Sequence, residues 1–331
     1  MPRTTPQWSS VALAAVLGAG AVGGMRAQSS PYRLVENWAQ VPQGFKWGEL
    51  ADADIDAQGN LWVLNRPPTP GISAVPKTGG GEMPVLMFDR SLKLVKSFGA
   101  GLFLQPHGLD VDPEGNVWVT DSGPFYKEGI TPGRGFQVFK FNPDGKLLMT
   151  LGKAGVSRAG PDTFVMPTDV VVNARGEIFV SDGHQPRPDP AVGDRIAKFS
   201  RDGTFITSWG AKKGSNPGEV SAPHRLAMDS RGRLFVADRG NRRVQIFDQE
   251  GRFLDEWKQF ETPSGLFIDR NDTLYVAVAG QTGGVRIGSA RDGTVTASIV
   301  GTAPEVVAVT WNGDVFAGLV GGMKLERYVK P

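Results

Sequence analysis

The chain of 331 residues contains only three histidines, and each one stands beside a short apolar stretch of similar pattern. His107 and His224 follow a proline at the start of such a stretch, and His184 comes just after the stretch IFVSD. Imidazole is a common metal ligand and a capable general base near neutral pH. Cysteine is absent, which excludes disulfides, thiolate nucleophiles and sulfur ligands. A metal centre in this protein must therefore use nitrogen and oxygen ligands.

An internal repeat sets the positions of these histidines. A short apolar strand, a polar turn and a second apolar strand occur six times, in copies that begin at Ala51, Pro106, Pro167, Pro223, Pro263 and Pro304. With the copies aligned on the turn, one position holds Ala51, His107, Thr168, His224, Ser264 and Glu305, at intervals of 56, 61, 56, 40 and 41 residues. Such intervals are typical of β-propeller blades.

The repeat predicts an all-β, six-bladed propeller over residues 31–331, as one domain. Gly and Pro number 44 and 24, which favours a turn-rich fold over a helical bundle. The runs WVLN and LFVAD are apolar on successive residues, as expected for strands covered on both faces. The sixth copy ends one strand short after Lys324–Val329, while Tyr32–Trp38 precedes the first blade without a partner. We predict that this N-terminal strand completes the last blade and closes the ring.

In such a ring, first-strand starts and second-strand ends share one rim. Blades two, four and six alternate around the axis, so His107, His224 and Glu305 are predicted to converge there. Two imidazoles and a carboxylate with one open position form a known catalytic zinc arrangement, and a similar set holds non-haem iron. The metal identity stays open at this point.

Three more residues are predicted on the same rim. Arg66 and Arg239 end the second strands of blades one and four, and a guanidinium can hold a substrate carboxylate in a bidentate fork. His184 ends the second strand of blade three, where an imidazole can serve as general base or as a further ligand.

Several stretches resemble known sequences. PGEVSAPHRLAMDSRGRLFVADRGNRRVQIFDQEGRFL, from Pro217 to Leu254, resembles an NHL repeat. QPHGLDVDPEGNVWVTD and MPTDVVVNARGEIFVSDG resemble peptidyl-α-hydroxyglycine α-amidating lyase, and the similarity spans most of residues 45–331. The resemblance implies an NHL-type six-bladed propeller that carries a zinc ion.

The resemblance also implies roles for individual residues. It places zinc on His107 and His224, and Glu305 stands where the family has a third histidine. His184 stands where the family has a tyrosine regarded as the catalytic base. It gives Arg66 and Arg239 substrate or active-site roles. The resemblance to NHL repeats implies that Arg242 and Arg243 are structural, because these repeats pair such arginines with acidic residues such as Asp238. The family's structural Ca²⁺ uses an Asp after the third histidine, and Val306 at that position cannot coordinate an ion.

The implied activity is a metal-dependent lyase that cleaves the C–N bond of an N-acyl-α-hydroxyglycine, giving an amide and glyoxylate. Its substrate would be a small molecule or peptide with a terminal carboxylate. Two alternatives stay open. One is a secreted NHL propeller that binds a peptide or polysaccharide without catalysis, and the other is a propeller lactonase with one divalent ion.

Residues 1–27 have the layout of a secretory signal peptide. Arg3 precedes the apolar stretch Val11–Val22, and the small residue Ala27 precedes Gln28. We expect export to the periplasm or extracellular space, with a retained N-terminal anchor as the alternative. Beyond residue 30 there are 34 basic and 34 acidic residues, a balance that does not favour nucleic acid as a partner. We expect a monomer that does not contact membranes after cleavage.

Overall fold

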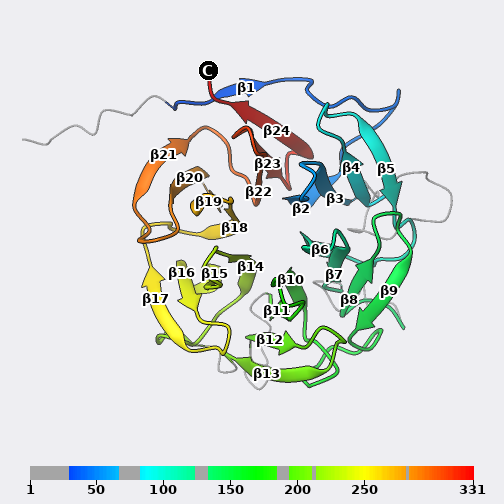
Figure 1. Ribbon diagram of the computed structural model, residues 1–331, viewed down its shortest axis with the longest axis vertical. Coiled ribbons are helices and arrows are strands. Elements are labelled where there is room, and N and C mark those ends of the chain that lie inside the picture. Colours follow the sequence, from blue (N-terminus) through cyan, green and yellow to red (C-terminus); the bar gives the residue numbers. More distant parts are fainter. Residues whose placement is uncertain (1–29, 67–82, 124–132, 185–193, 211–213, 281–282) are drawn as a thin grey trace, which may run out of the picture.

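The computed structural model describes residues 30–66, 83–123, 133–184, 194–210, 214–280 and 283–331. In these residues the strands form six four-stranded antiparallel sheets, which lie as blades around a common axis (Figure 1). The prediction of an all-β, six-bladed propeller is confirmed. Among the described residues, no helix has the length and apolar character needed to cross a membrane. The predicted signal peptide lies outside them.

The strands of blades one to three run outward from the axis in chain order. Blade one has β2 (Glu49–Ile55), β3 (Leu61–Arg66), β4 (Val85–Phe88) and β5 (Leu94–Phe98); blade two has β6 (Pro106–Val111), β7 (Val117–Asp121), β8 (Gln137–Phe141) and β9 (Leu147–Leu151); blade three has β10 (Pro167–Val172), β11 (Ile178–Asp182), β12 (Arg195–Phe199) and β13 (Phe205–Trp209).

Blades four and five repeat this order, and blade six combines both ends of the chain. Blade four has β14 (Pro223–Met228), β15 (Leu234–Asp238), β16 (Arg243–Phe247) and β17 (Phe253–Trp257), with the 3-10 turn η2 (Arg239–Asn241) after β15; blade five has β18 (Pro263–Ile268), β19 (Thr273–Val278), β20 (Gly284–Ser289) and β21 (Val295–Ile299); blade six has β22 (Val306–Val309), β23 (Val315–Leu319), β24 (Lys324–Val329) and β1 (Arg33–Val35).

The N-terminal strand closes the ring as the sequence predicts. β1 pairs antiparallel with β24, with Leu34 opposite Tyr328. The observed strand is shorter than Tyr32–Trp38, because Asn37 adopts a positive φ of 51° that is incompatible with an extended strand. Trp38 then turns inward, where its Nε1 donates a hydrogen bond to the carbonyl of Leu325 at 2.8 Å. This segment thus holds the two ends of the chain together.

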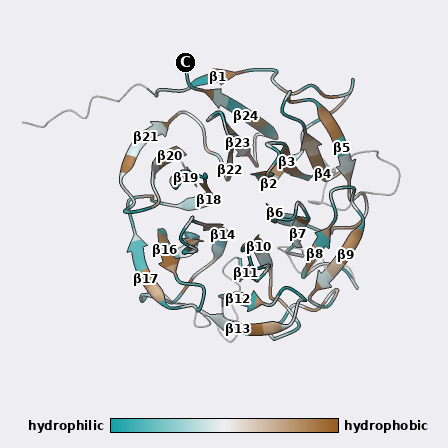
Figure 2. Cartoon of the chain, in the orientation of Figure 1, coloured by the Kyte–Doolittle hydropathy of each residue, from teal (hydrophilic) through white to brown (hydrophobic). Residues whose placement is uncertain are grey.

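Apolar side chains fill the spaces between neighbouring blades. One cluster joins Trp62 and Leu64 of blade one to Val117 and Phe141 of blade two, and the other clusters repeat this arrangement around the ring. The outer strands carry both hydrophobic and hydrophilic residues (Figure 2). Burial on both faces explains why the inner strands have continuous apolar runs.

The closing blade offers a direct test of this packing. Phe316 of β23 is fully buried, and its ring lies 4.8 Å from that of Trp38. Replacing Phe316 by alanine is expected to lower the free energy of unfolding by about 3–5 kcal/mol. Val300, which is 64% exposed, supplies the control, since Val300→Ala should change the free energy of unfolding by less than about 0.5 kcal/mol. Urea denaturation measures both.

Carboxylates near the axis link the first strands of adjacent blades. Asp52 accepts a hydrogen bond from the backbone N–H of Leu109 at 2.8 Å, and Asp169 accepts one from Leu226 at 2.7 Å. Asp54 and Asp110 bond in the same way to the next blade. Because these bonds cross between blades, they set the relative positions of the strand starts that carry the histidines.

Candidate metal centre

Three histidine side chains from three blades meet at one rim. The ring centroids of His107, His184 and His224 are 4.9–5.1 Å apart in all three pairs. One ring nitrogen from each lies within 4.8 Å of the others. His107 and His224 are the second residues of β6 and β14, whereas His184 follows the end of β11. The three imidazoles therefore form a triangle, although His184 is 77 positions from His107 and 40 positions from His224 in the sequence.

A glycine allows His184 to reach this position. Gly183 has a φ of 125°, which side-chain-bearing residues rarely adopt, and its backbone N–H donates to the carbonyl of Met166 at 2.9 Å. A Cβ at this residue would lie 2.2 Å from Asp194 Oδ1, so no larger residue fits. The motif SDGH thus turns the chain at the end of the strand.

Hydrogen bonds orient two of the rings toward a shared centre. His107 Nδ1 lies 2.8 Å from the carbonyl of Thr168, and His224 Nδ1 lies 2.7 Å from the carbonyl of Ser264. A carbonyl only accepts, so each Nδ1 carries the proton and each Nε2 keeps its lone pair. Such a second hydrogen bond is the usual way in which proteins orient metal-ligating histidines.

The surroundings keep all three imidazoles neutral. Burial, with the nearby Arg225 guanidinium, holds the pKa of His107 well below its usual value, and burial together with Arg239 does the same for the pKa of His224. Burial, then the charges of Arg239 and Arg66, lower the pKa of His184 to about 3. At neutral pH the three side chains are therefore in the form that ligates metals.

This donor set fits a transition metal. Zinc in a tetrahedral site has nitrogen ligands about 3.3 Å apart, so the separations here require side-chain shifts of about 1.5 Å or less. Three neutral nitrogen donors suit zinc and also iron, copper or nickel, and they leave one position for substrate. Hard oxygen-preferring cations such as Ca²⁺ are not favoured by three imidazoles.

Glu305 and Arg239 form an ion pair beside the histidines. Arg239 Nη2 lies 3.2 Å from Glu305 Oε1, and Arg239 Nη1 lies 3.0 Å from His224 Nε2. Glu305 Oε2 is 3.9 Å from the same Nε2. Both charged side chains are about one quarter exposed, at 26% and 29%. They line the open side of the histidine cluster, where an entering ligand would meet them.

The other predicted arginines are held more tightly. Arg66 is buried, donates from Nε to the carbonyl of Pro106 at 2.8 Å, and lies 3.4 Å from Glu49. Its own bonds therefore occupy part of the guanidinium. Arg243 forms a buried ion pair with Asp238 at 2.8 Å, which confirms the structural role predicted for it.

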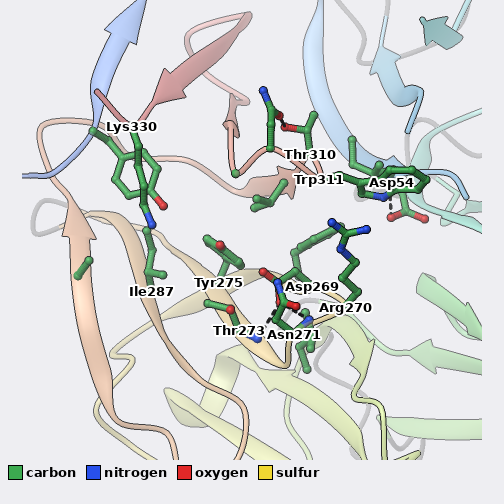
Figure 3. Close-up of a pocket in the computed structure, with 18 of the residues that line it drawn as sticks. Asp54, Asp269, Arg270, Asn271, Thr273, Tyr275, Ile287, Thr310, Trp311 and Lys330 are labelled. Atoms are coloured by element: carbon green, nitrogen blue, oxygen red, sulfur yellow. Dashed lines mark hydrogen bonds between the residues drawn. The ribbon is translucent and has the colours of Figure 1, made fainter. Parts of the chain in front are cut away.

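A pocket of about 800 Å³ lies at the opposite end of the inner strands, next to their hairpin turns. Asp54, Asp269, Arg270 and Trp311 line it (Figure 3). It contains none of the rim residues predicted from the sequence, so it is separate from the histidine cluster.

Comparisons with known proteins agree with this geometry. The NHL repeat model matches residues 103–125 and 221–247. Peptidyl-glycine alpha-amidating monooxygenase A of Xenopus laevis is 33% identical over 72% of this chain. A probable peptidyl-alpha-hydroxyglycine alpha-amidating lyase of Caenorhabditis elegans is 36% identical over 49% of it. This chain is an NHL-repeat propeller related to those proteins.

The relationship has clear limits of coverage. The matched region covers 26% of the length of the Xenopus protein and 42% of the length of the nematode protein. Mouse NHL repeat-containing protein 3 is 29% identical over 92% of this chain and 86% of its own length. A gluconolactonase structure from Xanthomonas campestris shares the fold, with a TM-score of 0.59 over 91% of this chain and 90% of its own, at 16% identity.

The structure groups the predicted site residues differently from the expected set. His107 and His224 converge as predicted, but the third imidazole of the cluster is His184, and Glu305 pairs with Arg239. The assignment of Glu305 as ligand and His184 as base stays a prediction. Val306 is buried in β22 and offers no side-chain oxygen, in line with the interpretation of that position.

Sequence reasoning missed Arg225, which contacts both His107 and the backbone of His224. A signal was present in the repeat. The position after the aligned histidines holds Asp52, Asp169 and Arg225 in three blades, and charged residues are rarely buried in a strand unless they are paired.

Proposed function

We propose that this protein is a metal-dependent carbon–nitrogen lyase that acts on an N-acyl-α-hydroxyglycine. The observation that carries the proposal is the convergence of His107, His184 and His224 at a rim that also presents the arginine side chain of Arg239. The relationship to a peptidyl-alpha-hydroxyglycine alpha-amidating lyase supports the choice of substrate. Zinc is the proposed ion.

The three histidines would hold the ion through nitrogen. When bound, the ion supplies a Lewis acid that lowers the pKa of the substrate α-hydroxyl. Arg239 would bind the substrate carboxylate in a bidentate fork, and so would exchange both of its present partners, Glu305 and the Nε2 of His224, for the substrate. This exchange would also free Nε2 for the ion. Arg66, already bonded to Pro106, adds positive charge nearby.

Glu305 is the proposed proton acceptor. As a ligand, His184 would give the lone pair of its imidazole to the ion and could not also accept the hydroxyl proton. Glu305 accepts the hydroxyl proton, and the O–H electron pair becomes the second bond of the aldehyde carbonyl. The C–N bond breaks, its electrons stay on nitrogen, and Glu305 returns the proton there. The products are a primary amide and glyoxylate, with no water consumed.

Two measurements test the proposal. Elemental analysis of the purified protein should give about one zinc ion per chain, and α-hydroxyhippurate should release glyoxylate and benzamide in equal amounts. Removing the ion with a chelator should abolish release, and adding zinc should restore it. Bound metal without glyoxylate would contradict the lyase proposal.

Arg239→Lys is expected to raise KM at least 10-fold with a smaller effect on kcat. Lysine keeps the positive charge but cannot form the bidentate pair with a carboxylate. Steady-state kinetics with α-hydroxyhippurate measure the effect, and Arg252→Lys, at an exposed side chain, is the control. Equal KM values for Arg239→Lys and the unaltered protein would remove the carboxylate-binding role.

A non-catalytic binding propeller is the second candidate. It is favoured by the similarity to NHL repeat-containing protein 3, which extends over nearly the whole of both chains and whose name states no reaction. In that case a peptide or polysaccharide would bind with equal affinity after metal removal. We propose further that the protein is exported and monomeric, which fractionation of cells and light scattering test.

A further inference from the structure

Arg225 crosses the axis of the propeller from blade four toward blades one and two. It follows His224 in β14, and its side chain is almost fully buried. Its Nη2 donates to the carbonyls of His107, at 3.0 Å, and of Ala51. Its Nη1 donates to the carbonyl of His224 at 3.0 Å. One side chain therefore joins three inner strands that are far apart in the sequence.

The three carbonyls occupy the same position in their blades. Ala51, His107 and His224 align in the repeat, at the starts of three of the six first strands. Two of these carbonyls belong to the histidines of the metal centre themselves. The planar guanidinium has five N–H groups in a rigid fork, so it sets the spacing of these carbonyls.

A carboxylate completes the environment of this arginine. Arg225 Nε lies 3.2 Å from Asp52 Oδ1, and Asp52 in turn binds the backbone N–H of Leu109 in the next blade. Arg225 Nη1 also lies 3.1 Å from His107 Nδ1, and both nitrogens face the carbonyl of Thr168, at 3.5 and 2.8 Å. The guanidinium and the ring of His107 thus share one acceptor, and the guanidinium also binds the backbone of both histidines.

The same side chain separates two parts of the axis. On the side away from the histidines, Arg225, Asp169, Leu226 and Leu266 line a cavity of about 210 Å³. The histidines lie on the other side of the guanidinium.

We infer that Arg225 is a positioning residue of the metal centre, which holds the main chain of His107 and His224 at the separation that their side chains need to share one ion. The inference rests on the proposed metal site. It assigns no contact between Arg225 and the substrate.

The test uses Arg225→Lys, which keeps the positive charge and loses the fork. Arg243→Lys is the matched control, because Arg243 is equally buried, pairs with Asp238 and donates to the backbone carbonyls of Ser215 and Glu219, yet lies in the third strand of its blade. Both variants remove a buried guanidinium from blade four, but only one acts on the histidines.

Two readouts are compared in the full chain. The first is Co²⁺ affinity with its visible absorption spectrum. We expect Arg225→Lys to weaken Co²⁺ binding about 10–100-fold and to change the spectrum, as is typical when partners of metal ligands are altered. The Co²⁺ affinity of Arg243→Lys should stay within about 3-fold of that of the unaltered protein. The second is the ¹⁵N NMR spectrum of the metal-free imidazoles, which is simple because the chain has three histidines. Arg225→Lys should shift the His107 signals, and Arg243→Lys should not.

The outcomes are distinguishable. If Arg225→Lys keeps the Co²⁺ affinity, the spectrum and the imidazole signals of the unaltered protein, the inference is overturned. If the unaltered protein binds no Co²⁺, the proposed metal site fails, and the NMR comparison still decides whether Arg225 positions the rings. If Arg225→Lys does not fold, the test uses Asp52→Asn, which removes the charged partner of the guanidinium. This variant should shift the same imidazole signals, by less than is expected for Arg225→Lys. Unchanged signals would count against the inference.

Discussion

Replacing His184 by alanine is expected to lower zinc affinity by more than about 100-fold and to abolish glyoxylate release. The loss of one of three nitrogen ligands should exceed the 10–100-fold effects that follow when only a partner of a ligand is changed. Competition with a chromogenic chelator measures the affinity, and elemental analysis measures the zinc content. The fold should survive, because the side chain lies after the end of β11 and outside the apolar clusters.

Glu305→Gln is the control that decides between the two possible ligand sets. If the histidine triangle holds the ion, this variant keeps its zinc while His184→Ala loses it. If Glu305 is the third ligand, as the aligned repeat predicts, the result is reversed. Zinc retained by His184→Ala and lost by Glu305→Gln would contradict the assignment proposed from the structure.

The same Glu305→Gln variant is expected to lower kcat by about 10²–10⁴-fold with zinc content unchanged. Such a loss is typical when a general base is removed, because a neutral amide cannot accept the proton of the substrate hydroxyl. Glutamine is also a weaker partner for Arg239, and because Arg239 must leave this partner to bind the substrate carboxylate, a moderate fall in KM should accompany the fall in kcat. Steady-state kinetics with α-hydroxyhippurate separate the two effects.

Glu305→Asp provides a matched comparison for this prediction. Aspartate keeps the carboxylate but shortens the side chain, so part of the activity should return relative to Glu305→Gln. A Glu305→Gln enzyme with the kcat of the unaltered protein would show that another group takes the proton. The most direct remaining candidate would then be His184, as the resemblance to the lyase family implies.

The first two predictions depend on one feature of the structure, the direction of the His184 side chain. Arg239 and Glu305 pair with each other on the open side of the cluster, where they are partly exposed. His184 places a ring nitrogen within 4.8 Å of both other histidines, whereas Glu305 Oε2 lies 3.9 Å from His224 Nε2 but does not belong to that cluster. We therefore expect ligation by His184 and proton transfer to Glu305, the reverse of the roles predicted from the aligned positions, and the variants above test this assignment.

Much of the fold was predictable because its causes are local and repeated. Turns such as PEGN require a residue that tolerates positive φ, and Gly115 supplies it with a φ of 84°. Asp112 accepts hydrogen bonds from the backbone of Glu114 and Asn116 in the same turn. Since each copy carries these signals, the number of blades, the order of strands and the pairing of β1 with β24 follow from the sequence.

The sequence by itself determined which residue types reach the rim: three histidines, two arginines and one glutamate at strand starts and ends. Only the tertiary structure decided which of them meet. His184 joins the cluster because Gly183 turns the chain after β11, and Arg225 reaches three strands because the first strands of different blades lie close around the axis. His184 and Arg225 contact His107 across 77 and 118 positions of the sequence. The geometry of these contacts depends on how whole blades pack, which no local pattern encodes.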